Sequence, residues 1–142
     1  MNEKKYKLTD ETITCLGKVL RRIEALKDFA DIKKGDKGGF VENEENLSQK
    51  GNCWIYDNVI VHENAKIHGN ARIYAHANIY GNAEIYGHAT IYDNVTIYGN
   101  AMICGNAKVY ENAEICGNVI IDGNAQIYGT HKFMETRKFT KM

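Results

Sequence analysis

The sequence contains no proline, so its turns must be made by other residues. Proline presets the φ angle of many turns, whereas glycine and asparagine accept the positive φ values of the tightest ones. Thirteen glycines are present, and several of them are followed directly by asparagine. We therefore expect a chain whose turns are built from Gly and Asn.

The sequence also has no surplus of either charge and no long apolar run. Eighteen Lys and Arg balance eighteen Asp and Glu, so a nucleic-acid-binding protein with a broad basic surface is not expected. No apolar stretch approaches the roughly 20 residues of a membrane-spanning helix. The charged N-terminal stretch MNEKKYKLTDE has no apolar segment behind it, unlike a secretory signal. We expect a cytoplasmic protein with no membrane partner.

Cysteine pairs with metal-binding or redox spacing are lacking as well. The four cysteines are Cys15, Cys53, Cys104 and Cys116, and no two of them form a Cys-x-x-Cys motif. We expect four reduced thiols in a cytosolic protein, with zinc binding or disulfides as the alternatives.

A six-residue repeat fills more than half of the chain. It runs from Asn52 to Gly129 in 13 copies without insertion. The first position is Asn eleven times and His twice, at His76 and His88. The second position is small, the fourth is Ile eleven times and Val twice, and the fifth is often Tyr. A period of six is a multiple of two, which suits strands and does not fit the 3.6-residue period of a helix.

This pattern closely resembles the aliphatic-x-x-x-small-x signature of the hexapeptide-repeat, left-handed parallel β-helix family. The resemblance implies an all-β triangular prism with three hexads, or 18 residues, per coil. The sequence carries that longer period too, because one column is tyrosine throughout: Tyr56, Tyr74, Tyr92, Tyr110 and Tyr128. We expect columns of Ile and Ala inside the prism and ladders of outward side chains on its three faces.

The repeat divides the chain into three predicted parts. Residues 1–45 form an N-terminal cap with a β-hairpin around Leu16, residues 46–129 form the β-helix, and residues 130–142 form a C-terminal plug and basic tail. Val41 and Leu47 are expected to continue the small-residue position of the repeat. Phe133 and Phe139 are expected to cover the last coil. The basic residues of the tail are Lys132, Arg137, Lys138 and Lys141.

The segment before the repeats adds a second resemblance. TDETI, followed by RIEALKDFADIKKGDKGGFVENEENLSQKGNCWIYDNV, is similar to the corresponding segment of the YdcK-like group of bacterial and prophage proteins. Members of that group are often labelled transferases because of their fold, and a fold alone does not fix a function. The resemblance implies a bacterial or phage origin and a bacterial host cell.

Acyl transfer from coenzyme A is the activity that the hexapeptide-repeat family implies. In such enzymes a catalytic histidine usually lies near a loop that interrupts the repeat, at a site between the subunits of a trimer. No loop interrupts residues 52–129 here. His76 and His88 are the candidate general bases; the alternative is that each replaces Asn in a turn.

Metal binding is a second activity found on this fold, in γ-class carbonic anhydrases. Their zinc is held by three histidines across a subunit interface. The spacing of His62, His68, His76 and His88 does not reproduce that motif, and no acidic partner is evident in the sequence. We expect no metal site.

The tyrosine column offers a binding surface. Its candidate residues are Tyr74, Tyr92 and Tyr110, together with Arg72 and Lys108. Stacked Tyr with interleaved cations suits a protein partner or a nucleotide-like ligand. A ladder that only stabilises the strands is the alternative. Acidic residues beside the column, including Asp93 and Glu111, make nucleic acid an unfavourable partner.

The sequence therefore favours a non-catalytic, oligomeric binding or scaffold protein with no cofactor. A trimer is the expected assembly, and a nucleotide-like small molecule held between subunits is the expected ligand. The alternative is a coenzyme-A-dependent acyltransferase.

Overall fold

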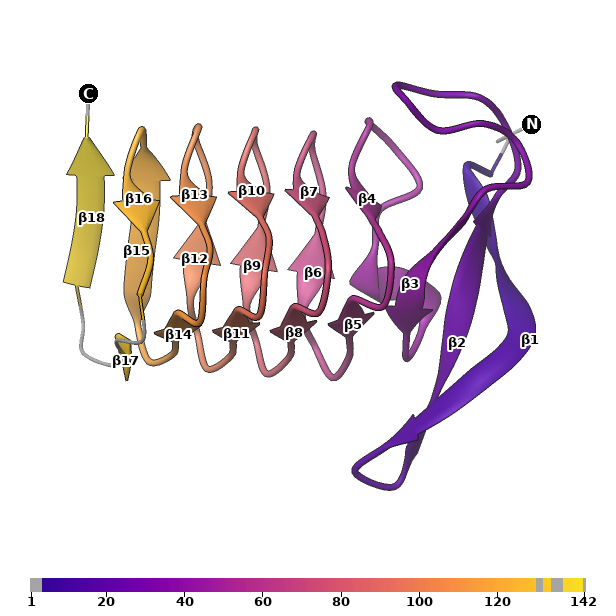
Figure 1. The fold of residues 1–142 in the computed structure, drawn as a ribbon, viewed down its shortest axis with the longest axis horizontal. Helices are drawn as coiled ribbons and strands as arrows, with labels where there is room; N and C mark the ends of the chain where they lie inside the picture. The colour runs from indigo at the N-terminus through magenta and orange to yellow at the C-terminus, as the bar shows by residue number, and fades with distance from the viewer. Residues whose placement is uncertain (1–3, 130–131, 134–136, 142) are drawn as a thin grey trace.

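The fold combines a hairpin cap with a parallel β-helix. A computed structural model describes residues 4–129, 132–133 and 137–141. Among them the one helical element is the 3₁₀ turn η1 (Glu44–Asn46). No helix in this part of the chain is long and apolar enough to cross a membrane. Figure 1 shows the coils stacked along the long axis, with the hairpin beside the first coil and β18 at the opposite end.

Three sheets make up the structure. Sheet one contains β1 (Tyr6–Cys15), β2 (Lys18–Ala25), β3 (Lys37–Val41), β5 (Ile60–Val61), β8 (Asn78–Ile79), β11 (Thr96–Ile97), β14 (Glu114–Ile115) and β17 (Lys132–Phe133). Sheet two contains β4 (Trp54–Ile55), β7 (Arg72–Ile73), β10 (Thr90–Ile91), β13 (Lys108–Val109) and β16 (Gln126–Ile127). Sheet three contains β6 (Lys66–Ile67), β9 (Glu84–Ile85), β12 (Met102–Ile103), β15 (Val119–Gly123) and β18 (Arg137–Lys141).

The coil has the length expected from the sequence. Strands one coil apart pair in parallel, and Ile73 faces Ile91, the residue 18 positions further along. The same register joins Ile79 to Ile97 and Ile85 to Ile103 on the other two sheets. The prediction of an all-β parallel helix with 18 residues per coil and an N-terminal hairpin is therefore confirmed.

The core consists of the aliphatic and small positions of the repeat. The Ile and Val side chains at the fourth position and the Ala side chains at the second are buried throughout the coils. Each fully buried Ile stabilises the fold by about 1.5–3 kcal/mol relative to an exposed side chain. Apart from β15, the strands from β4 to β16 are only two residues long, so this shared core stabilises them rather than local propensity.

Glycine is required at the corners where successive coils approach most closely. Gly87 has a φ of +67°, and a Cβ added there would lie 2.9 Å from the backbone nitrogen of Gly105. At this corner the backbone N–H of His88 donates to the carbonyl of Gly105 at 2.8 Å. Ala75 adopts a φ of +66° at a different corner, where the equivalent bond, from His76 to Asp93, is longer at 3.2 Å. The wider corner leaves room for a side chain.

The cap continues sheet one across the open end of the β-helix. β1 and β2 form an antiparallel hairpin, β2 pairs with β3, and β3 pairs in parallel with β5. The hairpin turns at Leu16 and Gly17, where the sequence predicts it, and both residues have positive φ. The cap thus protects an edge that would otherwise be free to pair.

Aromatic and polar contacts fasten the cap to the first coil. Tyr6 and Phe29 pack edge-on against Trp54, whose side chain is therefore buried rather than exposed on the face of sheet two. Lys5 is buried too, and its Nζ donates to the carbonyl of Cys53 at 2.7 Å and lies 3.3 Å from the Cys53 Sγ. Burial lowers the pKa of Lys5 and raises the pKa of Cys53.

One register prediction is wrong. Val41 and Leu47 were expected at the small position of the repeat, yet Val41 pairs with Val61 and Leu47 forms a bridge with Ile67. Both therefore occupy the aliphatic position. Val41 and Leu47 keep the six-residue spacing across η1, but Leu47 and Ile55 are eight residues apart. The segment between Leu47 and Ile55 therefore holds two residues more than a hexad, and the six-residue count does not extend back through it.

The C-terminal strands continue two of the sheets. Phe133 pairs with Ile115 and Phe139 pairs with Ile121 through their backbones. The Lys132 ammonium lies 3.4 Å from the Glu114 carboxylate. The side chains of the two phenylalanines and of Arg137, Lys138 and Lys141 lie outside the described residues, so the plug and the basic tail stay predictions, as do the three domain boundaries.

Candidate functional site

Outward side chains of the coils follow a simple rule. A side chain that follows a strand leans toward the first residue of the strand one coil further on, 16 positions ahead. The pairs are His62 with Asn78, His68 with Glu84, Tyr86 with Met102, Tyr98 with Glu114, and Tyr110 with Gln126. The coil therefore brings together residues that lie far apart in the sequence, and these pairs are where chemistry has to be sought.

The tyrosine column is divided into two stacks. Tyr56 and Tyr74 stack with ring centroids 4.3 Å apart. Tyr110 stacks on Tyr92 at 5.0 Å and on Tyr128 at 5.2 Å. Among the described ring contacts, none joins Tyr74 to Tyr92. The expected continuous wall is thus a pair and a separate triplet.

The first stack is tied to the cap. The Asp31 carboxylate accepts a hydrogen bond from the Tyr56 hydroxyl at 2.9 Å and lies 3.4 Å from Nη1 of Arg72. Burial, followed by the hydrogen bond to Asp31, raises the pKa of Tyr56. A hydrogen bond with Tyr74 raises the pKa of Arg72. Arg72 is therefore engaged in the structure itself, whereas Lys108 is exposed beside the second stack.

The two histidines proposed from sequence lie at exposed corners. His76 follows Ala75 on one corner, and His88 follows Gly87 on another. Their backbone N–H groups bond to the next coil, but neither side chain has a hydrogen-bond partner within the described part of the chain. No group of three or more metal-ligating side chains gathers there either.

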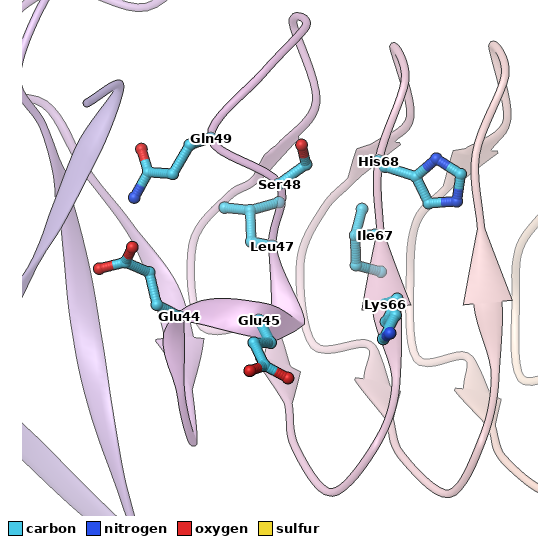
Figure 2. Close-up of a pocket in the computed structure, with 8 residues that line it drawn as sticks. All are labelled: Glu44, Glu45, Leu47, Ser48, Gln49, Lys66, Ile67 and His68. Atoms are coloured by element: carbon cyan, nitrogen blue, oxygen red, sulfur yellow. The ribbon is translucent and has the colours of Figure 1, made fainter. Parts of the chain in front are cut away.

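A hollow of about 360 Å³ lies where sheet three meets the cap. Figure 2 shows its lining, in which η1 and the segment after it form one side and β6 with His68 forms the other. The lining residues are Glu44, Glu45, Leu47, Ser48, Gln49, Lys66, Ile67 and His68. The bridge between Leu47 and Ile67 forms the apolar floor, and polar side chains stand around it.

Hydrogen bonds hold the wall of the hollow in place. The Asn43 side chain caps η1 by accepting from the backbone of Glu45, and the buried Asn46 side chain donates to the carbonyl of Ala65 at 2.9 Å. The Gln49 side chain accepts from the backbone N–H groups of Lys5 and Tyr6. The wall is thus joined to both the cap and the first coil.

His68, which lines this hollow, forms a close pair with Glu84 on the next coil. The His68 Nε2 lies 2.6 Å from a Glu84 oxygen, and each side chain is about 40% exposed. The ring of His68 also stacks on Tyr86 at 4.8 Å with an interplanar angle of 7°. No hydrogen bond to the His68 Nδ1 is formed by the described residues. An ionised Glu84 would accept the Nε2 proton and leave the Nδ1 lone pair free.

Sequence reasoning missed Glu84, because it found no acidic partner for any histidine. The signal was present but indirect, since Glu84 is related to His68 only through the coil length. His62 has no such partner: it is fully buried, stacks on Tyr80, and its Nε2 lies 3.1 Å from the Asn78 amide oxygen. His62 follows β5 and His68 follows β6, so the two lie on different faces.

Comparison with known proteins gives one informative match. No family model matches the chain. The "Uncharacterized acetyltransferase YdcK" of Escherichia coli (strain K12) is 51% identical over 39 residues. That segment covers 28% of this chain and 12% of the relative's length, so most of the relative has no counterpart in the match. The local similarity and the stacked 18-residue coils fit a hexapeptide-repeat β-helix protein that resembles YdcK.

Proposed function

We propose that this protein transfers an acyl group from a coenzyme A thioester to a small nucleophile bound in the hollow. The observation that carries the proposal is the His68–Glu84 pair, with 2.6 Å between Nε2 and the carboxylate at the edge of the hollow. His68 is the general base, and Glu84 is the positioning residue that fixes its tautomer. Both substrates would be bound from solution.

The chemistry needs one proton acceptor. The Nδ1 of His68 removes a proton from the hydroxyl or amine of the acceptor, which attacks the thioester carbonyl. The carbon–sulfur bond then breaks, the coenzyme A sulfur leaves as a thiolate, and the imidazolium returns the proton to it. Glu84 stabilises the imidazolium while it carries the proton.

Two further facts support acyl transfer over the non-catalytic scaffold favoured by the sequence. The relative that matches is named as an acetyltransferase, and the hollow provides the walled site that the uninterrupted repeat does not predict. His76 and His88, the bases proposed from the sequence, lie at corners outside the lining of the hollow.

Release of free thiol from acetyl-CoA tests the proposal. The purified full chain is incubated with acetyl-CoA and a panel of small amines and alcohols, and thiol is followed with a chromogenic disulfide. We expect acceptor-dependent release that falls roughly 100-fold or more in His68→Gln, the usual scale for loss of a general base. His88→Gln, at an exposed corner, is the matched control and keeps full activity. Equal activity in wild type and His68→Gln would refute the assignment.

A second candidate function is self-association through the tyrosine triplet. Tyr92, Tyr110 and Tyr128 form an ordered stack, Tyr128 is 53% exposed, and the exposed Lys108 stands beside them. Exposed aromatic surface of this kind favours a partner. We propose a trimer in which this surface contacts a neighbouring subunit, with room between subunits for a nucleotide-like ligand.

Light scattering on the full chain tests the trimer. We expect a trimer mass for the wild type and dissociation in Tyr110→Ser, because that change interrupts the triplet at its centre. Tyr98→Ser removes a ring from the face of sheet one and serves as the control. A wild-type monomer, or dissociation that is equal in both variants, would contradict the proposal.

A further inference from the structure

The hollow lies at the N-terminal end of a column of outward side chains that begins with two aromatic rings. The column on sheet three consists of His68, Tyr86, Cys104 and Asp122, one residue per coil. Leu47 bridges Ile67, so Ser48, the residue after Leu47, stands in register with His68. A small hydroxyl therefore occupies the position that a ring occupies in the next two coils, and the space left over is the hollow.

Tyr86 covers one face of the His68 ring, and His68 is among the residues that line the hollow. Tyr86 lies parallel to the ring on the C-terminal side, at 4.8 Å. On the N-terminal side the neighbour in register is Ser48, and both residues line the hollow. A flat group inserted there would continue a stack of aromatic rings that the chain itself begins.

Some of the polar side chains that line the hollow already have hydrogen-bond or ion-pair partners. The Gln49 amide binds the backbone of Lys5 and Tyr6. The Glu44 carboxylate is 3.0 Å from the ammonium of Lys4. The side chains of Glu45 and Lys66, by contrast, have no hydrogen bond or ion pair with any described residue. The Glu45 carboxylate is therefore free to accept a hydrogen bond, and the Lys66 ammonium is free to bind an anion.

We propose that the hollow binds a planar heteroaromatic ring with an exocyclic amino group, such as an adenine-type base, stacked on His68. The amino group donates to the carboxylate of Glu45, and an anionic substituent on the ligand faces Lys66. The stack covers the face of His68 and leaves Nδ1 at the edge of the ring accessible, while Nε2 stays bonded to Glu84. This inference deepens the proposed acyl transfer by naming the substrate class, but the stacking geometry is independent of catalysis.

Nucleosides without any acyl donor test the inference. Calorimetry and NMR are run on the full chain with adenosine, inosine and ribose. We expect binding in the order adenosine, inosine, ribose, because inosine keeps the ring but loses the amino group. The ring protons of His68 should shift upfield when adenosine stacks on them. Absence of adenosine binding at millimolar concentration, or binding that ribose matches, would overturn the proposal.

Placing an aromatic ring at position 48 gives one of a matched pair of variants. Ser48→Tyr places a ring in the hollow and is expected to abolish adenosine binding. Cys104→Tyr adds a ring to the same column on the far side of Tyr86 and is expected to leave binding unchanged. Ser48→Ala controls for the bond that the Ser48 hydroxyl accepts from the backbone of Lys50. Unchanged binding in Ser48→Tyr would place the ligand elsewhere.

Removing the stacking platform gives a test that does not depend on Ser48→Tyr folding. His68→Ala should weaken adenosine binding roughly five- to 150-fold, which corresponds to the loss of one base–aromatic stack. An affinity within twofold of the wild type would overturn the stacked geometry.

A third probe tells whether the bound base belongs to the acyl donor or to the acceptor. The adenosine bisphosphate portion of coenzyme A binds more tightly than adenosine, and loses that advantage in Lys66→Ala, if the base belongs to the acyl donor. Equal affinity of the two probes assigns the base to the acceptor. Adenosine binding without any thiol release would sustain the inference and overturn the proposed activity. Thiol release without nucleoside binding would do the reverse.

Discussion

Replacing Gly87 with alanine tests the corner geometry that sets the coil. The residue has a φ of +67°, and its Cβ would lie 2.9 Å from the backbone nitrogen of Gly105. Holding an L-residue in the left-handed region costs roughly 1–2 kcal/mol. Relief of the contact must also stretch the 2.8 Å bond from His88 to Gly105, at about 0.5–1.5 kcal/mol. We expect Gly87→Ala to lower the free energy of unfolding by about 2–3 kcal/mol.

Urea unfolding followed by circular dichroism measures this change. Ala75→Gly is the control, because Ala75 has nearly the same φ at a corner where the inter-coil bond is 3.2 Å. It should leave stability unchanged or increase it slightly, since the wider corner already accepts a Cβ. A Gly87→Ala protein within about 0.5 kcal/mol of the wild type, the usual range for a neutral surface change, would refute the close-approach argument.

Three further substitutions test the core and two contacts between the cap and the first coil. Ile91→Ala empties a fully buried position and should cost about 2–5 kcal/mol by urea unfolding; a cost below 1 kcal/mol would contradict the packed core. Asp31→Ala removes a partner that raises the pKa of Tyr56, so tyrosinate absorbance at that residue should appear at lower pH than in the wild type. Because that pKa is raised in the folded state, stability is full below the ordinary tyrosine pKa of about 10 and falls as pH rises above it. Lys5→Ala leaves the carbonyl of Cys53 without its donor and should cost about 1–3 kcal/mol, read from Trp54 fluorescence; an unchanged midpoint would show that the cap does not depend on this bond.

The coil was predictable because its signals repeat. Tyrosine at every eighteenth residue, from Tyr56 to Tyr128, reports the coil length directly, and the buried Ile and Ala columns follow from it. The corner glycines and the hairpin turn at Gly17 could be predicted for the same reason, since glycine takes positive φ at no steric cost.

The candidate site was not predictable to the same degree because it depends on where the repeat stops. Leu47 is in register with Ile67 because two residues more than a hexad lie between Leu47 and Ile55, and this register puts the small Ser48 at the start of the His68 column. Counting in sixes back from the repeat does not predict this change of register. The burial of Trp54 likewise comes from the cap packing over the coil, which sequence periodicity does not describe.

The pairing of His68 with Glu84 was missed for a geometric reason. The two residues are 16 positions apart, and they meet only because one coil advances 18 residues while the side chains lean toward the following strand. The same rule pairs Tyr98 with Glu114 at 2.7 Å on sheet one, away from the hollow. That second pair provides a control with the same 16-residue relation on another sheet.

Acetyl-CoA turnover by Glu84→Gln and Glu114→Gln is the measurement that tests the account most directly. Both changes replace a carboxylate that accepts a hydrogen bond from the residue 16 positions earlier. If His68 is the base and Glu84 positions it, kcat falls roughly 100-fold or more in Glu84→Gln with little change in KM, and Glu114→Gln keeps the wild-type rate. Wild-type turnover in Glu84→Gln, or equal losses in the two variants, would contradict the assignment of the hollow as the active site.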